Sequence, residues 1–87
     1  MHAVIVKVTI KDVDPATKLL REQVVPRAAQ APGFVAGYWT RKDNGGLSMI
    51  VCESEDAARA VAGQIESPEP DAVTVDEVEV REVVANA

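Results

Sequence analysis

Hydrophobic and polar residues alternate along the first ten positions of the chain. Val4, Val6, Val8 and Ile10 fall on one face of an extended backbone, and positions 3, 5, 7 and 9 fall on the other. Alternation with a period of two predicts a half-buried β-strand over residues 2–10. The second face is mixed rather than polar, so it also carries apolar surface that favours being covered.

A four-residue repeat of apolar positions follows the Asp14-Pro15 pair. Asp14 is expected to cap a helix, and Pro15 suits the first helical position. The repeat predicts an apolar stripe along this helix, formed by Ala16, Leu20, Val24 and Ala28. Pro26 lacks an amide hydrogen and crowds the carbonyl four residues back, so a kink or break is expected between residues 22 and 25.

The centre of the chain reads as two strands, residues 34–42 and 47–52, joined by a tight turn. The turn is Asp43-Asn44-Gly45-Gly46, in which Asn and Gly accept positive φ. If Lys42 pairs with Leu47, one face of the hairpin carries Val35, Gly37, Trp39, Arg41, Ser48, Ile50 and Cys52. The other face then carries Phe34, Ala36, Tyr38, Thr40, Leu47, Met49 and Val51. A three-residue loop would reverse this assignment.

The last third of the chain predicts one helix and one strand. Ser54 is expected to cap the helix, whose apolar face consists of Ala57, Ala58, Val61, Ala62 and Ile65. The segment Ser67-Pro68-Glu69-Pro70 ends the helix, because proline cannot continue it. Residues 73–84 read as a strand, and a change of phase at Asp76-Glu77 predicts a β-bulge.

The resulting order is β-α-β-β-α-β, which predicts an α+β, ferredoxin-like fold. The 87 residues suffice for one domain, spanning residues 1–87. Its four-stranded antiparallel sheet carries both helices on one face. The opposite face is left open and semi-apolar, which predicts a homodimer formed through that face.

Composition limits the classes of function. Hydrophobic residues make up 47% of the chain but aromatic residues only 3%, so the interior must be aliphatic. The net charge of −5 is uneven: residues 1–50 carry seven Lys/Arg and four Asp/Glu, whereas residues 51–87 carry two and ten. The acidic half is either a solvated surface or the complement of a basic patch, within the chain or on a second copy. The overall acidity argues against nucleic-acid binding, which needs a basic surface.

Other absences in the sequence narrow the location and the chemistry. One cysteine, Cys52, cannot form a disulfide within its own chain, which favours a reducing compartment. No apolar run approaches the ~20 residues that cross a membrane, and no signal-peptide pattern is present. A cytoplasmic protein without membrane contact is expected. No spacing of His, Cys, Asp and Glu indicates a metal site, and no Gly-rich phosphate loop is found.

Several short motifs lie around the hairpin: Pro32-Gly33-Phe34, a strand containing Trp39, the turn at 43–46, and Cys52-Glu53-Ser54 before an Ala-rich helix. Together they resemble the dimeric α+β barrel superfamily, and within it the antibiotic biosynthesis monooxygenase (ABM)-like group. The resemblance implies a homodimer and a cofactor-independent monooxygenase. Such an enzyme binds a small hydrophobic or aromatic substrate, stabilises its carbanion and lets oxygen react with it.

The chain departs from this family pattern in two places. Cys52 stands where the family usually has tryptophan. The haem-degrading relatives also rely on a histidine in the second helix, and Arg59, Ala60 and their neighbours provide none. No haem or other cofactor is therefore expected.

Four residues are candidates for substrate binding: Trp39, Tyr38, Arg41 and Lys7. Trp39 is either the wall of a pocket or packing at a dimer seam, and Tyr38 is either a proton donor or a core ring. Arg41 could hold an anionic oxygen or remain a solvated charge. Lys7 could act as a base or form a salt bridge across the dimer.

No residue is singled out as catalytic. Cys52 is expected to be a buried filler, because no base is placed beside it, and His2 lies at the start of the chain. The alternatives to an enzyme are a non-catalytic dimeric module for small-ligand binding or stress response, and a ligand-sensing domain. Fold alone does not separate these functions; an enclosed cavity lined by Trp39 and a convergent polar pair would favour chemistry.

Overall fold

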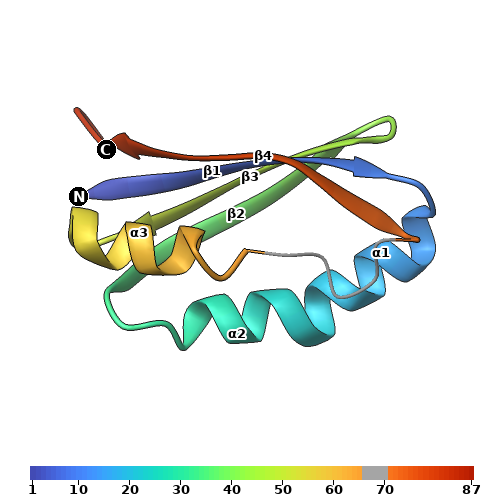
Figure 1. The fold of residues 1–87 in the computed structure, drawn as a ribbon, viewed down its shortest axis with the longest axis horizontal. Helices are drawn as coiled ribbons and strands as arrows, with labels where there is room; N and C mark the ends of the chain where they lie inside the picture. The colour runs from blue at the N-terminus through green and yellow to red at the C-terminus, as the bar shows by residue number, and fades with distance from the viewer. Residues whose placement is uncertain (66–70) are drawn as a thin grey trace.

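The computed structural model describes residues 1–65 and 71–87, which form one sheet and one layer of helices (Figure 1). The strands are β1 (His2–Ile10), β2 (Phe34–Lys42), β3 (Gly45–Cys52) and β4 (Val73–Glu82). They lie in the order β2-β3-β1-β4, and neighbouring strands are antiparallel. The helical segments are α1 (Val13–Leu19), η1 (Leu20–Val24), α2 (Val25–Ala29) and α3 (Glu55–Ala62). This is the predicted ferredoxin-like arrangement.

All helical segments lie on one side of the sheet, and the other side is uncovered (Figure 1). The core between the two layers is aliphatic, as its composition requires. It consists of Val4, Val6, Ile50, Cys52, Ala58 and Val61, with Trp39 and Phe34 packed against it. No helix within the described residues is both long enough and apolar enough to cross a membrane.

The hairpin between β2 and β3 is tighter than expected. Lys42 pairs with Gly45 rather than with Leu47, so the loop contains only two residues, Asp43 and Asn44. Asp43 adopts the left-handed region at φ 54°, which aspartate tolerates better than most residues. The register differs from the expected one by two residues, so the predicted faces of the hairpin are retained.

At its other end β2 contains a bulge that corrects one part of this assignment. Phe34 pairs with Cys52 and Ala36 pairs with Val51, which leaves Val35 unpaired. The extra residue turns Phe34 toward the helices, where it packs on the core, and leaves Val35 48% exposed. The prediction for these two side chains was therefore wrong, because alternation does not survive a bulge.

The first helix begins earlier than the sequence suggested. Asp12, not Asp14, occupies the N-cap position, and its side chain makes no capping hydrogen bond. Pro15 is accepted within the first turn because the amides there have no helical partner. The helix is not broken before Pro26. It instead widens into the π-helix η1, in which the amide of Val25 donates to the carbonyl of Leu20.

Two local predictions in the second half are confirmed. The hydroxyl of Ser54 accepts a hydrogen bond of 3.1 Å from the amide of Ala57 at the start of α3. The pairing of β1 with β4 shifts between Lys7, opposite Glu77, and Val8, opposite Val75, so Asp76 is the extra residue of a bulge. The predicted end of the helix at Ser67–Pro70 is wrong: α3 ends at Ala62 with Gly63 at its C-cap, before that segment, which itself lies outside the described residues.

The turn before β2 depends on Gly33. This residue has φ +80°, and a Cβ placed on it would lie 2.8 Å from the Cβ of Ala57. A side chain is therefore disfavoured both by the backbone conformation and by the contact with α3.

Gly33→Ala should lower the free energy of unfolding by about 1–3 kcal/mol, measured by urea denaturation. Gly63→Ala is the matched control. A Cβ at Gly63 would meet the carbonyl of Arg59 at 3.5 Å, an ordinary contact, and its φ is −67°. Equal losses in the two variants would contradict this account of the turn.

Candidate functional site

A cavity of about 340 Å³ lies between the sheet and the first helix. Its volume falls at the lower end of the range for small-molecule sites, roughly 300–1,000 Å³. All four strands, α1, η1 and Ile65 contribute to its walls. The described lining residues are Val6, Val8, Ile10, Ala16, Thr17, Leu19, Leu20, Arg21, Val24, Trp39, Thr40, Arg41, Gly46, Ser48, Ile50, Ile65, Val73 and Val75.

The cavity exists because small residues stand where large ones would fill the space. Ala16, Gly46 and Ser48 all lie on its walls. There is also no space for a side chain at Gly46, since a Cβ there would lie 2.5 Å from Cγ2 of Val8. An interior with so few aromatic residues has no large ring to occupy the remaining volume.

Trp39 is the one aromatic wall among the described lining residues. Its ring lies over Gly37: a Cβ at that glycine would be 2.5 Å from Cη2 and 2.7 Å from Cζ3 of the indole. The absence of a side chain at Gly37 therefore lets the ring lie close to the sheet. A flat aromatic surface beside aliphatic walls suits a flat hydrophobic ligand.

Ser48 is the buried polar group of the cavity. It pairs with Trp39 on β2 and with Val6 on β1, and it is 9% exposed. Its hydroxyl makes no hydrogen bond with the described residues. A lone hydroxyl on an otherwise apolar face is the sequence signal that could have marked this residue as a candidate.

The helical wall is shaped by the π-helix. An apolar repeat of four residues drifts by about 40° per turn against the 3.6-residue α-helix. A wider turn before Pro26 offsets part of this drift and keeps Leu20 and Val24 on the cavity. The same segment brings Arg21 to the cavity, a residue that the sequence reading missed. π-helical turns are frequent at functional sites.

The four candidate residues divide between the two faces of the sheet. Trp39 and Arg41 line the cavity, and Arg41 donates a hydrogen bond of 3.0 Å to the carbonyl of Asp43. Tyr38 and Lys7 lie on the uncovered face. Tyr38 is 65% exposed there, and Nζ of Lys7 lies 3.4 Å from a carboxylate oxygen of Glu77 in the same chain. The structure thus does not bring the four together.

The residues of the cavity do not fit haem ligation. Its described lining contains no His, Cys, Tyr or Met, which supply the axial ligands of haem iron. The described residues also contain no cluster of three His, Cys, Asp or Glu that could hold a metal ion.

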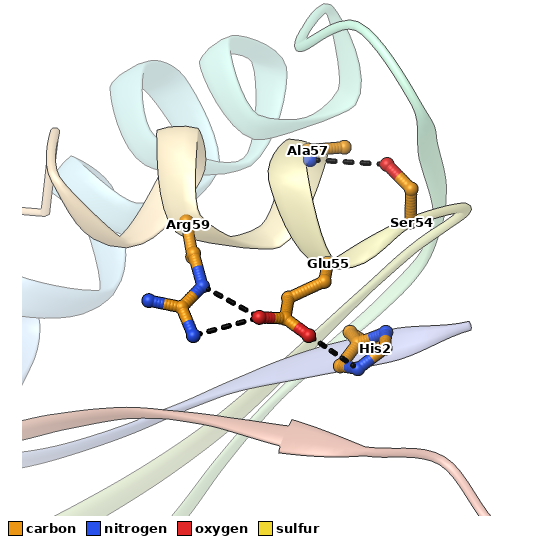
Figure 2. Close-up of polar contacts among 5 residues, drawn as sticks. All are labelled: His2, Ser54, Glu55, Ala57 and Arg59. Carbon is orange, nitrogen blue, oxygen red and sulfur yellow. Dashed lines mark hydrogen bonds and ion pairs between the residues drawn. The ribbon is translucent and has the colours of Figure 1, made fainter.

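His2 lies in β1 beside the start of α3 (Figure 2), and it is not among the described residues that line the cavity. Its Nε2 is 3.4 Å from Glu55 Oε2, and the other oxygen of Glu55 accepts hydrogen bonds from Arg59. These contacts join the start of α3 to β1. Nδ1 of His2 is buried without a hydrogen-bond partner among the described residues.

Comparison with protein-family models gave no match, and neither did comparison with curated protein sequences. In structure the chain is similar to MhuD, a heme-degrader from Mycobacterium tuberculosis that has two hemes bound in its active site. The TM-score is 0.53 at 20% sequence identity, over 97% of this chain and 98% of that one. The chain therefore shares its fold with this protein. The predicted resemblance is confirmed at the level of the fold.

Cys52 is fully buried in the core, and burial raises the pKa of its thiol. The reactive thiolate is therefore scarce near neutral pH. A thiol-specific reagent such as an aromatic disulfide should modify the native protein at least ~100-fold more slowly than the urea-unfolded chain. Rapid modification of the folded protein at pH 7 would contradict the assignment of Cys52 as an inert core residue.

Proposed function

We propose that this chain is a cofactor-independent monooxygenase that acts on a small hydrophobic, aromatic molecule in the cavity beside Trp39. The observation that carries the proposal is the cavity itself: about 340 Å³, with an aromatic wall at Trp39 and an unpartnered hydroxyl at Ser48. The shared fold with MhuD, a heme-degrader, supports oxidative chemistry on this scaffold. A cytoplasmic location is part of the proposal and rests on the single buried thiol.

The chemistry must be supplied largely by the substrate. An activated methylene between aromatic rings loses a proton to give a carbanion, which reacts with O2. The overall change is CH2 + O2 → C=O + H2O, in which the methylene carbon is oxidised by four electrons and both oxygen atoms are reduced. No external reductant is needed. The protein's part is to hold the ring against Trp39, exclude water and stabilise the anionic form through Arg21, Arg41 and Ser48.

Oxygen uptake tests this proposal. The protein with an anthrone as substrate should consume O2 with a 1:1 yield of the corresponding quinone, above the rate of the anthrone alone. Trp39→Ala should lower kcat/KM about tenfold or more, because the ring no longer orients the substrate. Trp39→Phe keeps an aromatic wall and should retain most of the activity.

The second candidate is a non-catalytic module that binds a small ligand. It is favoured by one feature of the cavity: the described lining residues include no His, Asp, Glu, Lys, Tyr or Cys that could transfer a proton. Binding of the anthrone to the wild-type protein with no oxygen uptake above background would favour this function over the oxygenase.

The proposal includes a homodimer formed through the uncovered face of the sheet. This face has an apolar half, on β2 and β3, that includes Tyr38, Leu47 and Met49, which are 65%, 49% and 44% exposed. Its other half, on β1 and β4, carries Lys7, Glu77, Glu79 and Arg81, which form the ion pairs Lys7–Glu77 and Arg81–Glu79 within the chain. Contiguous apolar surface rimmed by charges is typical of an interface.

Leu47→Glu should weaken the dimer at least ~10-fold, because each copy would bury a carboxylate in the apolar half of the interface. Gln64→Glu adds the same charge beyond the end of α3, on the helical side, and serves as control. Sedimentation equilibrium measures both. A wild-type protein that remains monomeric at micromolar concentration would remove the dimer from the proposal.

A further inference from the structure

The charges that line the cavity have one sign. The described lining residues include two arginines, Arg21 and Arg41, and no Asp or Glu. This is unexpected for a chain with 14 acidic and 9 basic residues and a net charge of −5. The cavity is therefore a local site of positive charge within an acidic protein.

Both guanidinium groups have donors available to a ligand. Arg21 makes no ion pair with the described residues, although Asp14 and Glu22 lie on the same helix surface. Arg41 gives one Nη1 hydrogen bond to the carbonyl of Asp43, and a guanidinium has five N–H donors. That bond also limits the motion of Arg41 at the hairpin end of the cavity.

A second polar group lies further along the sheet. Arg41 pairs with Gly46, and Trp39 pairs with Ser48, one step of two residues toward the centre of the strands. Two residues of extended strand span about 7 Å. The residue Ser48 is buried, and its hydroxyl has no hydrogen-bond partner among the described residues. This hydroxyl is separated from Arg41 by a distance comparable to a small ring system, with Trp39 beside it.

We infer that the ligand of this cavity is an aromatic organic anion, with a carboxylate or phenolate held by Arg21 and Arg41 and its ring lying against Trp39. A polar substituent near the far end of the ring reaches Ser48. The inference rests on the proposed function and makes it more specific. A charge-assisted hydrogen bond to a guanidinium is stronger than a neutral one, so the anion is selected over a neutral molecule of the same shape.

Three naphthalene derivatives of nearly equal size separate the contribution of charge from that of the cavity: 2-naphthoate, 2-naphthamide and 2-naphthamidine, which are anionic, neutral and cationic at pH 7. Isothermal titration calorimetry of the full chain should give an affinity for the naphthoate ~10-fold or more above that for the amide, with the amidine weaker still. The advantage of the acid over the amide should shrink as salt concentration rises.

Arg21→Gln and Arg41→Gln should each lower the affinity for the naphthoate about fivefold to tenfold and leave the amide nearly unchanged. Arg27→Gln removes the same charge from α2 at a residue that is not part of the cavity lining, and it should change neither affinity. Arg41→Lys should recover part of the loss, because it restores the charge without the planar fork.

The outcomes distinguish the inference from the proposed function. If the acid and the amide bind equally well and the arginine variants bind like the wild type, the selection of anions is overturned while a binding cavity remains. If none of the three compounds binds to the protein, the inference and the proposed ligand site both fail. An affinity change of the same size in Arg27→Gln would show that the effect is one of net charge and would also overturn the inference.

Discussion

The structure depends on one constraint: an aliphatic sheet is covered by helices on only one face. Val4, Val6 and Ile50 supply the apolar surface on that face, and Ala58 lets α3 lie close to it. Burying this surface is the main stabilising contribution available to a domain of this size. The cavity on the helix side and the exposed apolar residues on the other face both follow from this constraint. The helix side is too poor in large side chains to be filled at one end, and the other face of the sheet is left with exposed apolar residues.

The two ends of the helix layer pack against the sheet at different distances. Near α3 the small residues Ala57 and Ala58 allow close approach, and Gly33 leaves room for the turn that precedes β2. Near α1 the small residues lie on both walls, at Ala16 and at Gly46, so the layers do not interdigitate and a cavity remains. Small residues therefore allow close packing at the α3 end and leave a cavity at the α1 end. The difference is that near α1 the residues on both the helix and the sheet are small.

The sequence predicts the elements well because they depend on short-range patterns. Alternation located β1, and the hydroxyl of Ser54 marked the start of α3. The sequence predicts the local geometry less well where one residue is inserted into a repeat. Val35 interrupts the alternation of β2, and the wide turn before Pro26 cannot be distinguished by pattern from a kink. An inserted residue breaks the alternation between the side chains before it and those after it, as between Phe34 and Ala36, whereas the composition of the segment is unchanged.

Only the part of the candidate site that lies on the sheet could be predicted from the sequence. Trp39 and Arg41 lie on one face for reasons of strand parity, which the sequence contains, and Ser48 follows from the pairing of the hairpin. Arg21 lies on the cavity four positions after Thr17, but it falls outside the apolar stripe by which the sequence marks the inner face of the helix. Tyr38 and Lys7 were grouped with Trp39 by chemical type, but parity places them on the other side of the sheet.

Cys52 is fully buried in the core, beneath α3, and is not among the residues of the cavity. The aromatic wall is provided by β2, where Gly37 gives the indole of Trp39 space to lie close to the sheet. The chemistry that a cavity can support depends on the polar groups around the ring, and the described ones here are Arg21, Arg41, Ser48, Thr17 and Thr40.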